Sequence, residues 1–235
     1  MTEAEIKRAE REAESDAEWL GLLLLLAFRK KRAADVTEVR FDAATGRFYL
    51  NGRAVSVRSI RAYLTRIEDR MARRLVQITT RLEKGEITLA EWKREFDRTV
   101  TSTHILAGAL ALGGISVAAR NGFTLERIAE QLVYADRFAE DMRKGRAGSL
   151  AKMRSRAKQY ARAAHITFSN AEHLARQALG VQREAMRIRR AAESCRPCIK
   201  FSNKWMPIEA MPPIGSFPKE IGGCAHYCRC YLVYR

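Results

Sequence analysis

Proline is absent from the first 196 of the 235 residues. Because proline breaks the interior of a helix, its absence permits long helices over most of the chain. The last 39 residues contain all five prolines: Pro197, Pro207, Pro212, Pro213 and Pro218. We therefore expect a helical body followed by a tail of different architecture.

Long apolar runs are also lacking. The longest, residues 19–28, would reach about 15 Å as a helix, which is half the thickness of a bilayer core. A Glu-rich segment precedes this run and the basic residues 29–32 follow it, so it does not have the form of a signal peptide. We expect a protein without a membrane partner that is not secreted, whose thiols are reduced or bound to metal.

Familiar catalytic patterns are missing as well. The sequence has no GxxxxGK[ST] or GxGxxG phosphate-binding pattern and no GxSxG serine motif. His165 and His173 are eight residues apart, not the four that place two ligands on one helical turn, and His104 is expected to be a core or helix-cap residue. The adjacent carboxylates Glu68 and Asp69 would point apart on a helix and lie in solvent. We therefore expect no catalytic residues and no enzyme.

Aspartate does not occur after residue 142, and this absence reflects an uneven charge distribution. The chain carries a formal charge of +16, of which residues 143–235 contribute +14. Such a basic segment predicts a polyanionic partner, with nucleic acid the first candidate and an acidic protein surface the second. The candidate contact residues are Arg154, Arg156, Lys158, Arg183, Arg187 and Arg190.

The N-terminal residues 2–32 predict one helix, with Thr2 and Glu5 as a capping box. Its leucine run is apolar on every face and therefore requires burial on every face. Two interpretations have equal weight: a helix within this protein's own core, or an arm that docks into a neighbouring subunit. The residues that would dock are Leu22, Leu23, Leu24, Leu25 and Leu26.

A small β element is expected over residues 36–58, which are rich in strand-forming residues. Its Asn51-Gly52 pair is a strong signal for a two-residue hairpin turn. From Ser59, which can cap a helix, apolar residues recur every three or four positions as far as Gly85. This spacing predicts a helix with one apolar face.

Four further helices are expected along the body. Thr88 and Glu91 form a capping box that begins the first, and Thr124 can cap the second. The small residues 107–109 predict close helix packing. The expected ranges are 88–114, 124–145, 149–180 and 181–193.

The fold class predicted from these patterns is mainly α. A multi-helix body would carry a small β-hairpin near residues 36–58 and a cysteine-rich module resembling a zinc knuckle. The expected divisions are an N-terminal helical arm (1–34), a small β element (35–58), a helical body (59–194) and a cysteine-rich tail (195–235).

All five cysteines lie in the tail, which begins with a C-x2-C pair. Two thiolates from one tight turn can face the same ion, and zinc requires four such ligands in a tetrahedron. We expect a zinc ion, and we expect its role to be structural because the tail has only two carboxylates for catalysis. The alternatives are disulfide or mixed chemistry and five ordinary buried cysteines. The candidate ligands are Cys195, Cys198, Cys224, Cys228 and Cys230, with His226 a further donor. One or two of these are surplus, so the ligand set stays open.

The tail resembles the C-terminal signature of the phage head morphogenesis family, the relatives of the phage Mu F protein. The likeness lies in the C-x2-C pair, the loop with proline and glycine, and the final Cys228-Arg229-Cys230. Weaker similarities cover residues 41–48, 85–92 and 149–160. The commoner family ending His-Pro-Asn-Cys-Arg-Cys is here Cys-Ala-His-Tyr-Cys-Arg-Cys.

This resemblance implies a structural minor head protein of a tailed phage. Such a protein would be made in the host cytoplasm and assemble in the virion at or near the portal vertex. Its expected partners are the portal protein, the major capsid protein and packaged DNA. The alternatives are a free zinc-containing nucleic-acid-binding protein, an assembly factor and, with least support, a metal-dependent hydrolase.

Overall fold

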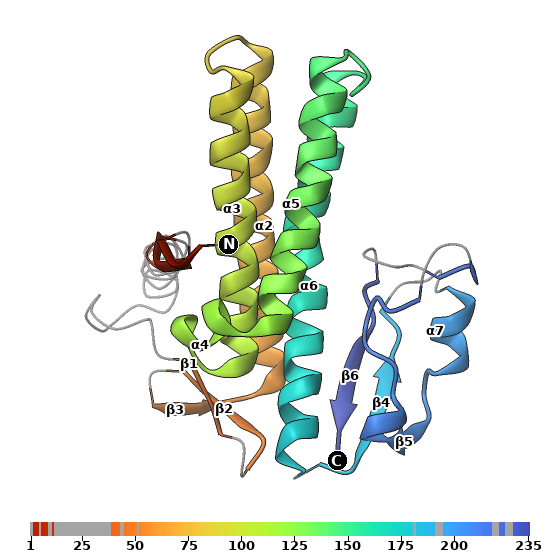
Figure 1. Cartoon of the computed structure of the whole chain (residues 1–235). Helices are drawn as coiled ribbons and strands as arrows, with labels where there is room; N and C mark the ends of the chain where they lie inside the picture. Colours follow the sequence, from red (N-terminus) through yellow and green to blue (C-terminus); the bar gives the residue numbers. More distant parts are fainter. Residues whose placement is uncertain are drawn as a thin grey trace.

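The computed structural model describes residues 2–4, 6–8, 11, 39–42, 45–50, 52–180, 182–190, 195–217, 221–223 and 228–235. It is mainly helical, with two small antiparallel sheets, and the predicted fold class is confirmed (Figure 1). Among the described helices, none combines the length and apolarity needed to cross a membrane. The leucines predicted to dock, residues 22–26, lie outside the described residues.

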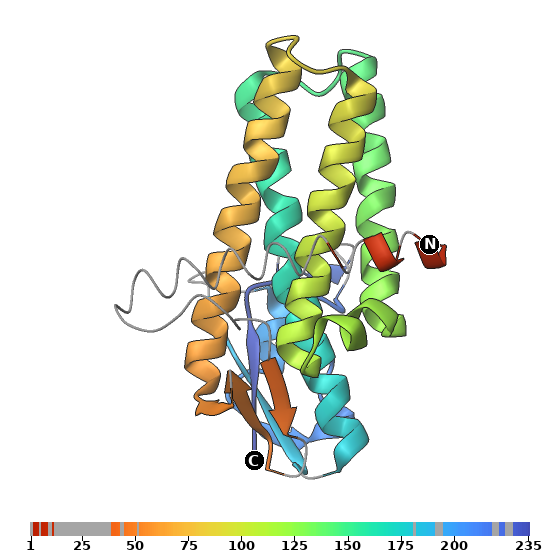
Figure 2. The same ribbon diagram turned by 90° about the vertical axis from the view of Figure 1, so that its left-hand side faces the viewer.

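The body is a bundle of four long helices and one short helix. They are α2 (Val57–Glu83), α3 (Leu89–Leu112), α4 (Ile115–Arg120), α5 (Gly122–Arg143) and α6 (Leu150–Leu179). Figures 1 and 2 show α2 and α3 as one long hairpin beside the hairpin of α5 and α6. Helix α6 packs extensively against both α2 and α3, and these interfaces organise the core.

Periodic apolar residues explain why these helices pack. In α2 the predicted stripe is buried, from Ile60 through Met71 to Ile78. Beside it, Trp92 stacks on Phe96 with ring centroids 4.5 Å apart. A Cβ added at Gly108 of α3 would lie only 2.9 Å from the side chain of Thr124 on α5. The close helix packing predicted for residues 107–109 is therefore confirmed, and it is the packing of α3 against α5.

Helix caps agree with the sequence in part. The capping box of Thr88 and Glu91 is present, and Ser149 caps α6. Ser56 caps α2 in place of the predicted Ser59, and Asn121 caps α5 in place of Thr124. In both corrections the true cap lies three residues earlier and accepts a hydrogen bond from the backbone N–H of the predicted one. Each predicted cap is thus a residue of the first helical turn.

The first sheet contains β1 (Val39–Asp42), β2 (Arg47–Leu50) and β3 (Arg53–Val55), paired antiparallel in that order. It confirms the predicted small β element. Phe48 of β2 is fully buried, and its ring centroid lies 6.5 Å from that of Phe168 in α6. This contact attaches the sheet to the lower part of the bundle.

The second sheet corrects the helix predicted over residues 181–193. There β4 (Glu184–Ile188) is the central strand between β5 (Trp205–Pro207) and β6 (Tyr231–Tyr234). Burial alternates along β4, where Ala185 and Arg187 face inward. Because one inward residue is an arginine, the alternation was hidden in the sequence. The sheet thus takes its central strand from the segment assigned to the body.

The C-terminal module (residues 182–235) also contains the short helix α7 (Arg196–Lys200) and the 3-10 turn η1 (Ile208–Ala210). It packs beside the lower half of α6, as Figure 1 shows. Nine buried residues form its own small core, and three of them are cysteines. This core includes Ile166, which α6 contributes. The module and the bundle therefore share a buried boundary.

Candidate metal centre

Three cysteines far apart in sequence meet inside the C-terminal module. Cys198 lies on α7, whereas Cys228 and Cys230 lie just before β6. All three are buried, and their Sγ atoms lie within 4.8 Å of one another. The Sγ atoms of Cys198 and Cys228 are 3.8 Å apart. This cluster could hold a metal ion.

The remaining candidate ligands stand differently. Cys195 is the N-cap of α7 and half-buried, and within the described part of the chain it is not in this three-thiol group. Cys224 and His226 lie outside the described residues. The described cysteines form no disulfide. The structure therefore assembles three ligands and leaves the fourth unassigned.

Without an ion, the cluster favours protonated thiols. Hydrogen bonding to Cys198 and Cys228, followed by burial, raises the pKa of Cys230 far above its usual range. A metal ion must therefore displace protons to bind, as at other thiolate sites. Thiolates are soft ligands, which suits zinc or iron and not magnesium or calcium.

A buried cation contacts the cluster. Arg187 is fully buried, and its Nη1 donates to the Sγ of Cys198 at 3.2 Å. Its Nη2 donates to the carbonyl oxygens of Pro212 and Pro213. It forms no ion pair with any described residue. This burial corrects the prediction that Arg187 lies on a nucleic-acid contact surface.

Polar side chains of α6 bind the backbone of the module. The Nε2 of His165 lies 2.8 Å from the carbonyl oxygen of Cys230. The side chain of Asn170 accepts from the N–H of Ile214 and donates to its carbonyl oxygen. Further along, His173 and Gln177 reach the carbonyl oxygens of Met211 and Ile208. This polar row, defined as His165, Asn170, His173 and Gln177, fixes the C-terminal module against the bundle.

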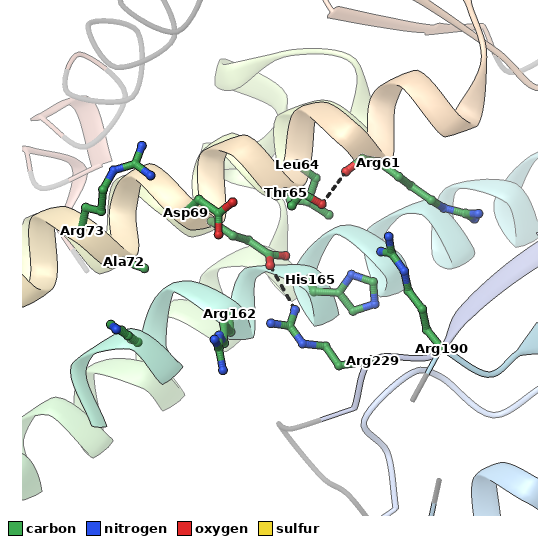
Figure 3. Close-up of a pocket in the computed structure, with 12 residues that line it drawn as sticks. Arg61, Leu64, Thr65, Asp69, Ala72, Arg73, Arg162, His165, Arg190 and Arg229 are labelled. Atoms are coloured by element: carbon green, nitrogen blue, oxygen red, sulfur yellow. Dashed lines mark hydrogen bonds and ion pairs between the residues drawn. The ribbon is translucent and has the colours of Figure 1, made fainter. Parts of the chain in front are cut away.

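Arg229, between two of the cysteines, forms a second link to the bundle. Its Nη1 lies 3.0 Å from the Oε2 of Glu68 on α2 (Figure 3). Glu68 is buried, which corrects the expectation that it lies in solvent. Burial raises the pKa of Glu68 to about 7, although the charge of Arg229 opposes the shift.

A cleft of about 530 Å³ adjoins this ion pair between α2 and α6. The labelled side chains in Figure 3 come from both helices and from the C-terminal module. Glu68, Asp69 and His165 are among its polar lining residues. Six of the lining residues are basic: Arg61, Arg73, Lys158, Arg162, Arg190 and Arg229.

The predicted basic contact residues are distributed over several environments. Lys158 and Arg190 line the cleft. Arg156 pairs with Asp141 at 2.8 Å, and Arg154 donates to Thr80. Arg183 is exposed outside the cleft. Only part of the predicted set therefore shares one surface.

Sequence reasoning missed the polar row and the neighbours of Glu68. One signal was available, because the steps of five, three and four residues from His165 to Gln177 place these side chains on one helical face.

No family model, curated protein or solved structure matches this chain.

Proposed function

We propose that this protein is a structural minor head protein of a tailed phage, with a zinc ion that holds its C-terminal module together. The observation that carries the proposal is the convergence of Cys198, Cys228 and Cys230. These cysteines belong to the tail that resembles the head morphogenesis family. One cysteine of the C-x2-C pair and both cysteines of Cys228-Arg229-Cys230, which carry the likeness, thus build the cluster.

Zinc suits the thiol geometry. Four ligands at about 2.3 Å from a zinc ion lie about 3.8 Å from one another in a tetrahedron. The separation of 3.8 Å between the Sγ atoms of Cys198 and Cys228 agrees with that edge. A disulfide would require about 2.05 Å. The fourth ligand would come from Cys195, Cys224 or His226.

The buried guanidinium of Arg187 supports a charged thiolate cluster. Enclosing an uncompensated cation costs several kcal/mol. A zinc ion with three or four thiolates carries net negative charge, which offsets the guanidinium 3.2 Å from Cys198. Three neutral thiols would provide no such compensation.

A structural role for the ion fits its surroundings better than a catalytic role. A catalytic zinc keeps an open position for water or substrate. Here all three assembled ligands are buried, and the side chain near Cys198 is a cation and not a general base. In the proposed role the ion connects α7 to β6, while the polar row holds that unit on α6.

The proposal is tested by quantitative mass spectrometry of particles purified from the phage that encodes this chain. We expect the chain in the particles at a copy number comparable with that of the portal protein. A copy number comparable with the major capsid protein would contradict a location near the portal. Complete absence would contradict the head-protein role.

The second candidate is a free zinc-containing nucleic-acid-binding protein or assembly factor. The basic cleft beside the metal centre favours it. Absence from the particles together with DNA binding by the purified chain would select this candidate.

A further inference from the structure

The cleft next to the metal centre has one strongly basic lining. Its two long walls are α2, with Arg61 and Arg73, and α6, with Lys158 and Arg162. The C-terminal module supplies Arg190 and Arg229 (Figure 3). Residues distant in sequence thus place cations around one concave space.

Most of this positive charge is not neutralised inside the protein. Arg73, Lys158, Arg162 and Arg190 are exposed and form no ion pair with the described residues. Glu68 is paired with Arg229 and also interacts electrostatically with Arg162, so this single carboxylate offsets only a small part of the positive lining. Asp69 is the second carboxylate of the lining, and among the described lining residues six cations against two carboxylates leave a formal net charge of +4.

We propose that this cleft binds the phosphodiester backbone of a nucleic acid without reading its sequence. The inference deepens the DNA contact in the proposed function, and it rests on that part of it. It assigns the contact to a defined set of side chains and not to the whole basic half of the chain.

The chemistry of the lining selects phosphates over an acidic peptide. Peptide and protein partners are anchored by apolar or aromatic side chains in pockets. Of the twelve described residues that line the cleft, only Leu64 and Ala72 are apolar. Five of the six cations are arginines, whose planar forks match phosphate oxygens.

The same lining favours contact with the backbone over contact with the bases. Single-stranded nucleic acids are commonly held by aromatic side chains that stack on the bases. Among the described residues, the lining contains no phenylalanine, tyrosine or tryptophan. Contacts to phosphates fix position on the strand but carry no sequence information.

The length of the cleft suits a polymer better than a single phosphate. Arg61 and Arg73 are twelve residues apart on α2, which corresponds to about 18 Å along the helix. One strand of duplex DNA presents a phosphate about every 3.4 Å along its axis, or roughly five over that length. Several cations could therefore engage one backbone at once.

The metal centre supports one side of the cleft. Arg229 is flanked by Cys228 and Cys230, and it pairs with Glu68 on α2. The cluster therefore holds the guanidinium in place from one end and Glu68 holds it from the other. Arg190, two residues after β4, lies on the same side.

The test measures binding of the full chain to labelled DNA by fluorescence anisotropy over a series of salt concentrations. Two duplexes of unrelated sequence and one single strand serve as probes. The cleft variant is Arg73→Gln/Arg162→Gln. The matched control is Arg94→Gln/Arg183→Gln, which removes the same charge at exposed positions outside the cleft.

We expect both duplexes to bind the wild type with equal affinity. The cleft variant should bind roughly tenfold more weakly, and the slope of log K against log salt should fall by about 2. The control should keep the wild-type slope. Tighter binding of the duplex or of the single strand identifies which form supplies the phosphates, and the cleft variant must weaken that form.

Three results would overturn the inference. The wild type could fail to bind DNA, or both double variants could weaken binding equally, which would indicate diffuse charge. Binding of a polyglutamate peptide that requires Arg73 and Arg162, without DNA binding, would assign the cleft to an acidic protein. None of these results alters whether the chain is found in particles, so the head-protein role fails or stands separately.

Discussion

Arg187 is a residue whose environment in the fold differs from the one its sequence context predicts. In the sequence it is one of many basic residues in a charged segment, but in the fold it is enclosed beside Cys198. A buried cation without a carboxylate requires another anion nearby, and the thiolate cluster is the group in contact.

Replacing Arg187 with leucine therefore tests the charge of the cluster. We expect Arg187→Leu to lower the free energy of unfolding by about 3–5 kcal/mol, because the anionic centre loses its compensating cation. Zinc should also be released to a competing chelator at lower chelator concentration. Arg183→Leu, at the exposed position just before the same strand, should change stability by less than about 0.5 kcal/mol. Equal stability and metal retention in the two variants would contradict an anionic cluster.

His104, which is distant from the cysteines in sequence, makes the free energy of unfolding depend on pH. It is fully buried, its Nδ1 lies 2.6 Å from the Oγ1 of Thr167, and its Nε2 has no hydrogen-bond partner among the described residues. Burial lowers the pKa of His104 to about 3, below the unfolded value of 6.5. As the pH falls below 6.5, His104 is protonated in the unfolded chain but stays neutral in the folded chain. The free energy of unfolding therefore falls.

The variant His104→Gln should remove this dependence. Between pH 7 and pH 5, the wild type should lose about 2 kcal/mol more of its free energy of unfolding than the variant. Urea unfolding at each pH measures the difference. Parallel stability curves for the two proteins would show that His104 does not titrate on unfolding.

Among the elements, the helices of the bundle were the most predictable. The apolar residues of α2 recur on one face, and a single buried face is what helical periodicity reports. Strand β4 was missed because its burial depends on β5 and β6, which are distant in sequence. Local pattern alone could not indicate that pairing.

The candidate site was predictable to a similar extent. The cysteine spacing indicated a metal cluster, and three of the five cysteines do meet. The polar row on α6 was not found, because His165 and Asn170 resemble ordinary polar helix positions until their backbone partners are known. Those partners, Cys230 and Ile214, lie more than forty residues away.

Asn170 tests how strongly this row holds the module. The variant Asn170→Ala leaves the buried N–H and carbonyl oxygen of Ile214 without partners, which should cost about 2–4 kcal/mol of stability. Ser155→Ala is the control, since Ser155 is exposed on the same helix. Chemical denaturation compares the two variants. Equal stabilities would show that water or other groups replace the interaction with Asn170.

At the scale of the whole molecule, the two cores differ greatly in size. The bundle and the first sheet share a large apolar core, whereas the small core of the module consists, among the described residues, of nine side chains, of which three are cysteines and one, Ile166, comes from α6. A core this small rarely supports a fold without a metal or a disulfide. The module should therefore depend on its ion, while the bundle should remain folded when the ion is removed.

The most direct test of a structural zinc ion in the C-terminal module is native mass spectrometry of the full chain purified without chelator. We predict one zinc ion per chain with every cysteine thiol unoxidised. In the double variant Cys198→Ser/Cys228→Ser the ion should be absent, while the helical circular-dichroism signal of the bundle remains. A metal-free wild type, a mass lowered by disulfide formation, or full zinc retention in the double variant would contradict zinc binding by the cysteine cluster.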